Sequence, residues 1–316
     1  MKTVSFRNIQ INYSSCITTI IKRRSTFKIN YVKQLLILWA IIILIFSCKT
    51  SSERDLSLGK TVDTNYQSVV AILRVDSTGK TIISGSGVLI HPNVILTAGH
   101  NNFSNAKTYW DKHCSTTGYI AFGNNALQSS ELISFNWLSD IITHPDQTEL
   151  IKFDSDTSQE KGIPEFTDIG LIFIDHAVLN KPIITLPTND ALSRISKMDR
   201  LVGVGYGYHK IDTVYERIPG LVDGLRRRWK LHEITLLNDL WLSTNCDSLT
   251  NLPFIGMFDS GAPLLLNDSI VVGIWGRGDK APDPCLYSSV AARIDNNRIK
   301  NWILESIRTR LNSEIK

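Results

Sequence analysis

The sequence predicts an all-β protein that ends in one α-helix. From about residue 67 the apolar residues occur in short runs rich in Val, Ile and Leu, and turn residues such as Gly, Pro, Asn and Asp separate the runs. After residue 295 the pattern changes, and the apolar residues recur at the spacing of one helix face. Short strands with turns between them are typical of an antiparallel sandwich or barrel.

Length and composition agree with a globular protein. The 316 residues suffice for one large or two medium domains, and the chain is 43% hydrophobic and 20% charged. Five cysteines are too few for a disulfide scaffold. The formal net charge is +4, but residues 1–47 carry seven basic and no acidic residues, which leaves 4 − 7 = −3 for residues 48–316. This mildly acidic remainder gives no indication of a nucleic-acid partner.

The N-terminal segment has the order of a secretory signal peptide, which we place at residues 1–48. The basic start leads into an apolar run at residues 35–46, which is shorter than the about 20 residues of a membrane span. The ending at residues 46–49 (Phe-Ser-Cys-Lys) resembles bacterial lipoprotein signals, in which the cysteine, here Cys48, is lipidated and becomes the mature N-terminus. An uncleaved membrane anchor and ordinary secretion are the alternatives.

A polar stretch without periodicity at residues 49–62 predicts a tether, so the folded domain should begin at residue 63. Residues 146–166 are also polar and predict a long surface loop. The expected strands of the first half lie at residues 69–75, 81–83, 87–90, 94–97, 119–123, 132–135, 141–145 and 168–175.

The second half of the chain repeats the pattern of short strands and then changes to a helix. A run of basic residues at 226–228 is typical of a solvated sheet edge. Asp295 is the expected N-cap of a helix over residues 295–312. The apolar stripe of that helix predicts core packing and consists of Ile299, Trp302, Ile303, Ile307 and Leu311. The expected strands lie at residues 201–208, within 229–242, and at 270–275 and 286–290.

Three residues are candidates for nucleophilic catalysis. A serine becomes a good nucleophile only if a base takes its proton and an acid orients that base. Ser260 lies in a loop of turn-forming residues, which fits a nucleophile loop and a plain surface turn equally well. His100 ends an expected strand, where it can project into a cleft, although a lone histidine is usually structural. Asp168 opens an apolar run, either as a strand-start cap or as the partner of a histidine.

These residues occur in the order His100, Asp168, Ser260, at intervals of 168 − 100 = 68 and 260 − 168 = 92 residues. Their contexts are residues 96–100 (Leu-Thr-Ala-Gly-His), 167–171 (Thr-Asp-Ile-Gly-Leu) and 258–263 (Phe-Asp-Ser-Gly-Ala-Pro). Together they resemble the chymotrypsin/trypsin family of serine endopeptidases in its bacterial form.

The resemblance covers roughly residues 63–311 and includes Ser-Gly-Ser-Gly-Val-Leu-Ile at residues 84–90 and Ile-Thr-His-Pro at residues 142–145. It implies a trypsin-like domain over residues 63–316 that consists of two antiparallel six-stranded β-barrels with the active site between them. The first barrel would span about residues 63–190 and the second about residues 191–294, followed by the helix.

The resemblance also implies a role for each residue of the triad. Ser260 would attack the scissile carbonyl, and His100 would take its proton and later protonate the leaving amine. Asp168 would hold the histidine tautomer and stabilise the imidazolium. The backbone N–H groups of Phe258 and Ser260 would form the oxyanion hole.

Phe258 is a departure from the family pattern, which has glycine at this position. The backbone N–H is retained, but a side chain restricts the backbone and crowds the side from which the leaving group departs. Losing one oxyanion donor typically lowers turnover by about 100- to 1000-fold. A displaced Phe258 amide would therefore leave a slow enzyme.

A second departure lies at residues 273–278 (Gly-Ile-Trp-Gly-Arg-Gly), where the family usually has Ser-Trp-Gly after Gly-Ile. Either Trp275 or Arg277 takes the position of the tryptophan, and in both alignments the serine that assists the triad acid is missing. From the resemblance we expect Trp275, Gly276 and Gly278 to contact the substrate.

Substrate preference and activation also differ from trypsin. Phe254, six residues before Ser260, would lie at the base of the specificity pocket, and it is not the acid expected for cleavage after Lys or Arg. No Ile-Val-Gly-Gly activation sequence occurs near residues 56–66, so a new N-terminus is not expected to activate the protein. Asp259 must then have another partner.

Cys246 and Cys285 lie in loops that flank the specificity pocket in the family, so they could form a disulfide in an oxidising envelope. Cys114 would be left over, and Cys16 lies in the removed segment. No Cys/His cluster has metal-ligand spacing, and the glycines of residues 201–208 are not followed by a helix pattern, which argues against dinucleotide binding. We therefore expect neither a metal nor another cofactor.

Three functions are compatible with these patterns. The first is a monomeric serine endopeptidase that acts on protein or peptide substrates and is lipid-anchored in the bacterial cell envelope, in the periplasm or at the outer-membrane surface, or secreted. The second is a catalytically impaired lipoprotein of the same fold that binds peptides or partners. The third is an unrelated β-rich lipoprotein with a coincidental triad, in which the three side chains would lie far apart.

Overall fold

The structure is a computed structural model that describes part of the chain, within the unit Asp55–Lys316. The signal segment with Cys48, the other four cysteines, Phe254 and Gly278 lie outside the described residues. None of the described helices is long and apolar enough to cross a membrane. The described residues are 61–76, 78–102, 115–147, 167–195, 201–207, 224–230, 234–237, 239–244, 258–277 and 290–313.

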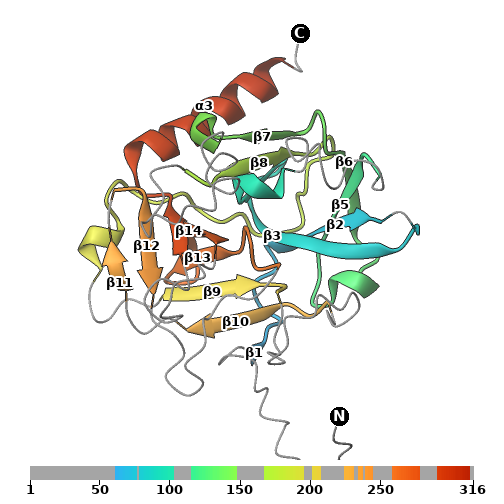
Figure 1. Cartoon of the computed structure of the whole chain (residues 1–316), viewed down its shortest axis with the longest axis horizontal. Helices are drawn as coiled ribbons and strands as arrows, with labels where there is room; N and C mark the ends of the chain where they lie inside the picture. Colours follow the sequence, from blue (N-terminus) through green and yellow to red (C-terminus); the bar gives the residue numbers. More distant parts are fainter. Residues whose placement is uncertain are drawn as a thin grey trace, which may run out of the picture. The chain divides into compact units, whose positions relative to one another are not determined.

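A first antiparallel sheet contains seven described strands in the order β6-β5-β2-β3-β4-β8-β7 (Figure 1). Its edge strands β6 and β7 are consecutive in sequence and are separated only by residues 137–140, so the sheet curls on itself. The strands are β2 (Val69–Val75), β3 (Thr81–His91), β4 (Val94–Thr97), β5 (Thr117–Ala121), β6 (Leu132–Asn136), β7 (Ile141–Thr143) and β8 (Gly170–Phe173).

A second antiparallel sheet contains eight described strands in the order β1-β10-β9-β13-β14-β15-β12-β11. Here β10 and β11 are consecutive and are separated only by residues 231–233. The strands are β1 (Thr61–Val62), β9 (Leu201–Gly205), β10 (Arg227–Lys230), β11 (Ile234–Leu237), β12 (Trp241–Thr244), β13 (Pro263–Leu266), β14 (Ile270–Arg277) and β15 (Val290–Arg293).

The predicted all-β fold of two antiparallel barrels and a C-terminal helix is confirmed. Each barrel has six strands if β6 with β7, and β10 with β11, are each counted once and β1 is set aside. The extra strand is β1, which pairs with β10 although the sequence assigns residues 61–62 to the tether. The tether prediction is wrong for residues 61–62. They have no hydrophobic pattern in the sequence, but they pair with β10 at the edge of the sheet.

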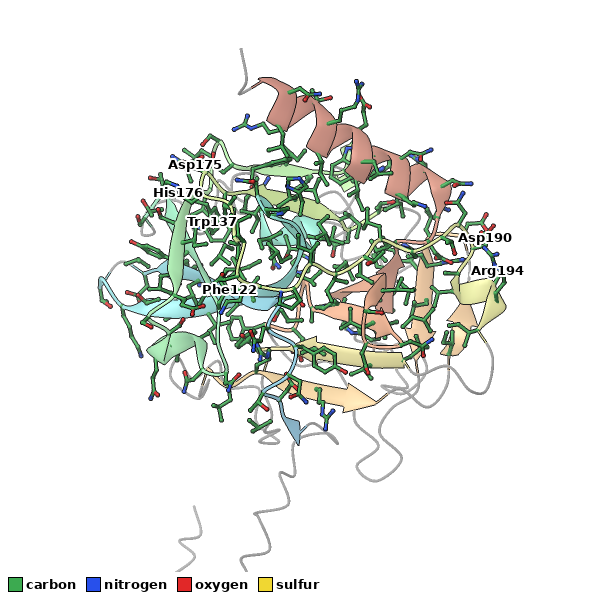
Figure 2. The ribbon with its side chains drawn as sticks, turned by 180° about the vertical axis from the view of Figure 1, so that it is seen from behind. Phe122, Trp137, Asp175, His176, Asp190 and Arg194 are labelled. Carbon is green, nitrogen blue, oxygen red and sulfur yellow. The ribbon has the colours of Figure 1, made fainter. Side chains whose placement is uncertain are left out.

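One apolar cluster spans both barrels, and each barrel also has a smaller cluster of its own. The largest cluster of buried side chains includes Val69 and Leu96 of the first sheet, Val204 and Trp241 of the second, and Ile299 of the helix. Figure 2, seen from behind, shows Phe122 and Trp137 in the first barrel, whereas Asp190 and Arg194 lie beside the second. Because the barrels are packed together over this core, side chains from either one can be held in fixed geometry at their junction.

Helix α3 (Asn297–Ser313) lies beside β7 and β8 in Figure 1. Its predicted stripe is confirmed: Ile299 and Ile303 are fully buried, and Trp302, Ile307 and Leu311 pack against the same core. The predicted cap is wrong. Asn296 accepts the Arg298 N–H at its side-chain oxygen, because the Asp295 carboxylate is already bonded to Arg293 and to the Leu192 N–H.

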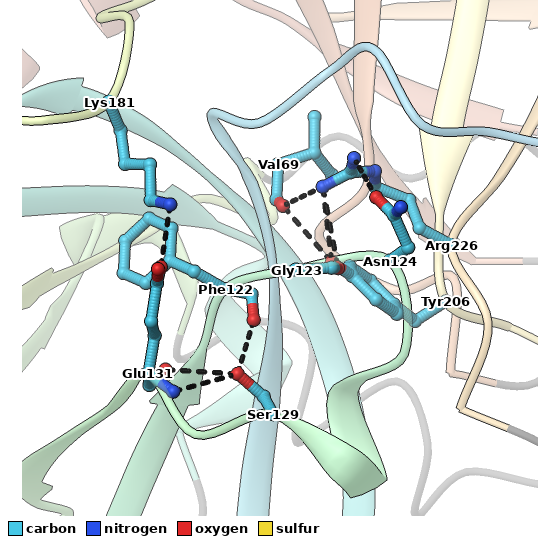
Figure 3. A network of polar contacts seen from close by, with 9 residues as sticks. All are labelled: Val69, Phe122, Gly123, Asn124, Ser129, Glu131, Lys181, Tyr206 and Arg226. Carbon is cyan, nitrogen blue, oxygen red and sulfur yellow. Dashed lines mark hydrogen bonds and ion pairs between the residues drawn. The ribbon is translucent and has the colours of Figure 1, made fainter.

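A buried polar network joins the two barrels (Figure 3). Arg226 is fully buried, so the solvated edge predicted for it is wrong. Its guanidinium bonds Asp63 at 3.1 Å and Asn124 at 3.0 Å. Tyr206 donates its hydroxyl to the Gly123 carbonyl at 2.5 Å, and burial raises the pKa of Tyr206 to about 12, although the nearby Arg226 opposes this rise. Tyr206 therefore stays a neutral donor at physiological pH.

Candidate active site

His100 lies in the 3₁₀ turn η1 (Gly99–Asn101), which directly follows the buried strand β4. Its Nδ1 is 2.6 Å from Asp168 Oδ2, and its backbone N–H donates to Asp168 Oδ1 at 2.8 Å. Asp168 is 1% exposed, whereas the His100 side chain is 33% exposed. One carboxylate thus holds both the ring and the main chain of the histidine, and leaves the other ring nitrogen accessible.

Ser260 completes a hydrogen-bonded series of three side chains. Its Oγ is 2.8 Å from His100 Nε2. Because an ionised carboxylate can only accept, Nδ1 carries the proton that it shares with Asp168, and Nε2 is left as the acceptor for the serine hydroxyl. Asp168 and His100 come from the first barrel and Ser260 from the second, so the barrel junction brings together three residues that are far apart in sequence.

The backbone around Ser260 is held on both sides. Its carbonyl accepts the Ser86 N–H at 2.8 Å and the Asn101 side-chain amide at 2.9 Å. Gly261 has φ +87°, and a Cβ there would meet the Ala98 amide nitrogen at 3.0 Å, so glycine is needed for this close approach. The Gly261 N–H donates to the Trp275 carbonyl at 2.6 Å, which ties the loop to β14.

The N–H groups of this loop are the candidate oxyanion donors. Among the described residues, the Ser260 N–H has no hydrogen-bond acceptor. Phe258 has φ +72°, a left-handed conformation that costs a residue with a Cβ roughly 1–2 kcal/mol. Its side chain packs against the main core, and its carbonyl accepts the Ser86 hydroxyl at 2.9 Å. The loop therefore holds Phe258 in a conformation that glycine would adopt without a steric cost.

Asp259, for which the sequence left the partner open, is fully buried and accepts the Gly207 N–H at 2.9 Å. A Cβ on Gly207 would come within 2.5 Å of both carboxylate oxygens. Glycine at this position therefore lets the backbone after β9 approach the carboxylate and donate to it. This backbone N–H is a partner for Asp259 that requires no new N-terminus.

The structure places Gly276, and not Trp275, beside the candidate triad. A Cβ on Gly276 would lie 2.6 Å from Asp168 Oδ2, so the backbone of Gly276 closely approaches the acid of the candidate triad. The Trp275 side chain is fully buried in the core of the second barrel. The expectation that it contacts substrate is wrong, because it alternates to the inward face of β14.

Two residues near the candidate triad were missed in the sequence: Ser86 lies inside the stretch 84–90, and Asn101 directly follows the stretch 96–100. Ser86 and Asn101 are buried and bond the Ser260 loop. Their small polar side chains carry no periodic signal, and only their partners across the barrel junction reveal them. Within the described stretches, no group of three or more His, Cys, Asp or Glu side chains could hold a metal ion.

No protein-family model and no curated protein matches the sequence. Among solved structures, the chain is similar to HL collagenase (TM-score 0.53, 14% identity), to GrC (0.54, 16%) and to the scabies mite inactivated protease paralogue S-I1 (0.52, 14%). Each similarity covers 79% of this chain and 98 to 99% of the other. The chain therefore has the trypsin-like fold of chymotrypsin-type serine proteases, and at these identities the similarity concerns the fold.

Proposed function

We propose that the protein is a serine endopeptidase that hydrolyses peptide bonds through Ser260, His100 and Asp168. The observation that carries this proposal is the continuous series from Ser260 Oγ to His100 Nε2 (2.8 Å) and from His100 Nδ1 to Asp168 Oδ2 (2.6 Å). These distances favour the proposal over a coincidental triad, whose three side chains would lie far apart. The trypsin-like fold supports protein or peptide substrates.

In the proposed reaction, Ser260 Oγ forms a bond to the scissile carbonyl carbon while its proton moves to His100 Nε2. The tetrahedral intermediate collapses when the C–N bond breaks, and His100 delivers the same proton to the leaving amine. Water then attacks the acyl-enzyme with His100 again as base, which releases the carboxylic acid and restores Ser260. The buried Asp168 holds the Nδ1 side of the ring and stabilises the imidazolium in both steps.

The oxyanion of each intermediate would be bound by the backbone N–H groups of Ser260 and Phe258. The Ser260 N–H supports this role because no described residue accepts a hydrogen bond from it. Such donors stabilise the charge that develops in the transition state, since they are oriented before the reaction starts.

A serine-directed fluorophosphonate probe tests the proposal. The folded wild-type protein should be labelled, and Ser260→Ala should not be labelled. Ser269→Ala is the matched control, because Ser269 lies in an exposed turn nine residues further along (269 − 260 = 9) and should leave labelling unchanged. A folded wild-type protein that resists the probe would refute the proposal. A peptide-library cleavage profile would then define the preferred side chain before the scissile bond.

The second candidate function is a protein of this fold that binds peptides or partners without efficient turnover. Two observations favour it: the strained φ of Phe258 in the oxyanion loop, and Gly276, a residue without a side chain, beside the acid of the candidate triad. One of the similar structures is itself described as an inactivated protease paralogue. Peptide binding by a folded sample that the probe does not label would favour this function over the first.

We also propose that the mature protein is a monomer anchored in the bacterial cell envelope by a lipid on Cys48. The support is the basic and apolar order of residues 1–47 before that cysteine. Mass spectrometry of the mature N-terminus tests the anchor, and an unmodified N-terminus at any other residue would refute it.

A further inference from the structure

Ser86 is a fully buried serine of β3 that contacts the Ser260 loop through both its backbone and its side chain. Its N–H donates to the Ser260 carbonyl at 2.8 Å. Its Oγ lies 3.0 Å from the Tyr206 N and 2.9 Å from the Phe258 carbonyl oxygen. An N–H can only donate and a carbonyl can only accept, so the hydroxyl receives the Tyr206 proton and directs its own proton at Phe258.

Phe258 requires a restraint because its φ of +72° lies in the left-handed region that residues with a Cβ rarely adopt. The side chain and the carbonyl turn together about the N–Cα bond. The side chain is held by packing against the main core, and the carbonyl is held by Ser86. A rotation about the N–Cα bond of Phe258 that relaxed φ would also move Asp259 and Ser260, which follow it in the chain.

The Ser86 hydroxyl is itself held in place. It receives its hydrogen bond from Tyr206, whose ring hydroxyl is bonded to the Gly123 carbonyl in the first barrel (Figure 3). Because the hydroxyl accepts from a fixed N–H, its own proton is available for donation, and the Phe258 carbonyl at 2.9 Å receives it. The contact is therefore directional and is not merely a consequence of dense packing.

We propose that Ser86 is a positioning residue for the oxyanion loop, residues 258–260. Its hydroxyl fixes the Phe258 carbonyl and its N–H fixes the Ser260 carbonyl. The backbone N–H groups of Phe258 and Ser260 are therefore kept oriented toward the same oxyanion position. Ser86 belongs to the first barrel and the loop to the second. This residue therefore fixes the position of the oxyanion loop relative to the first barrel, which carries His100 and Asp168. The inference rests on the proposed protease function.

The first test compares Ser86→Ala with Ser84→Ala in the full-length mature protein. Ser84 is a matched control, because it is a buried serine of the same strand and its hydroxyl has no hydrogen-bond partner in the described part of the chain. The rate of fluorophosphonate labelling at saturating probe should fall about 10- to 100-fold in Ser86→Ala, less than the about 1000-fold limit for a lost oxyanion donor. The half-saturating probe concentration should not change, and Ser84→Ala should match wild type.

The second test repeats Ser86→Ala in a Phe258→Gly background. Glycine adopts φ +72° without strain, so the loop depends less on the Ser86 hydroxyl. The loss caused by Ser86→Ala should therefore be several-fold smaller in this background than in the wild type, which a double-mutant cycle measures directly. An equal loss in both backgrounds would overturn the proposal.

The outcomes separate this proposal from the protease function. If the folded wild type is not labelled, both fail. If the wild type is labelled and folded Ser86→Ala is labelled equally fast, only the role of Ser86 fails. Should Ser86→Ala not fold, Ser86→Cys keeps a group of similar size with a weak S–H donor and should label at an intermediate rate. Wild-type labelling by that variant would again overturn the role of Ser86.

Discussion

The Nε of Arg226 lies 3.1 Å from Oδ2 of Asp63, and both side chains are buried where the N-terminal end of the described domain meets the second barrel. Arg226 also reaches the Asn124 side chain and the Val69 carbonyl in the first barrel (Figure 3). The pair thus connects three segments that are distant in sequence. A buried charge pair of this kind is costly to break, because the remaining charge stays away from water.

Arg226→Met should lower the free energy of unfolding by about 3–5 kcal/mol, the usual cost of leaving one member of a buried ion pair without its partner. Urea denaturation of the variant and the wild type measures this difference. Arg228→Met is the matched control, since Arg228 lies two residues further on and is exposed. Similar denaturation midpoints for both variants would show that the buried pair contributes no special stability.

Gly276→Ala should reduce fluorophosphonate labelling of Ser260 by about 100-fold, because displacing a reacting group by about 1 Å can cost that much. The new Cβ would lie 2.6 Å from Asp168 Oδ2, so Asp168 or the β14 backbone must shift and disturb the contact with His100. Gly273→Ala on the same strand is the control, since its nearest neighbours are side-chain carbons at 3.3 to 3.4 Å. Unchanged labelling of Gly276→Ala would contradict the tight placement of Asp168.

Gly207→Ala should also reduce labelling while the protein stays folded. A Cβ at this position would come within 2.5 Å of both Asp259 carboxylate oxygens, so Asp259 and the adjoining Ser260 must shift. The loss should be at least about 10-fold, and circular dichroism should show that the fold is retained. A folded variant with wild-type labelling would mean that the Gly207–Asp259 bond does not position the nucleophile.

The stability of the protein should fall as the pH is lowered through about 6.5. Burial lowers the pKa of His144 below its ordinary 6.5; Asp146 opposes this effect and Arg298 adds to it. The unfolded chain then binds more protons than the folded protein, so stability is complete above about pH 6.5 and is lost as the pH falls below it. Burial lowers the pKa of His91 as well, with the same sign.

Thermal unfolding between pH 8 and about pH 5 tests this linkage. His144→Phe should flatten the dependence of Tm on pH but not remove it, because His91 remains. His176→Gln, at an exposed position, is the control and should leave the slope unchanged. An unchanged slope in His144→Phe would contradict the assignment.

Ile303→Ala should destabilise the protein by about 2–5 kcal/mol, because Ile303 is fully buried where helix α3 meets the core. Leu304→Ala, one residue on, is the control, since Leu304 is 47% exposed. Chemical denaturation measures both. Equal effects at the two positions would contradict the docking of the helix.

Sequence periodicity predicted most of the fold because strands and helices leave local signals. The alternation of apolar runs with turns located β2, β4, β6 and β14 to within about two residues. The predicted runs at 81–83 and 87–90 are one strand, β3, since Gly85 and Gly87 interrupt the apolar signal without ending the ladder. Glycine often ends a strand, but these two glycines lie within one because the neighbouring side chains leave no room for a Cβ.

The sequence by itself determined the all-β class, the C-terminal helix and the order of His100, Asp168 and Ser260, because each depends on residue type and local spacing. Only the tertiary structure decided that the three side chains meet, that Arg226 is buried, and that Gly276 stands beside Asp168. It also revealed Ser86 against Phe258. These relationships join residues from different barrels, and local periodicity carries no information about partners that lie across a junction between two sheets.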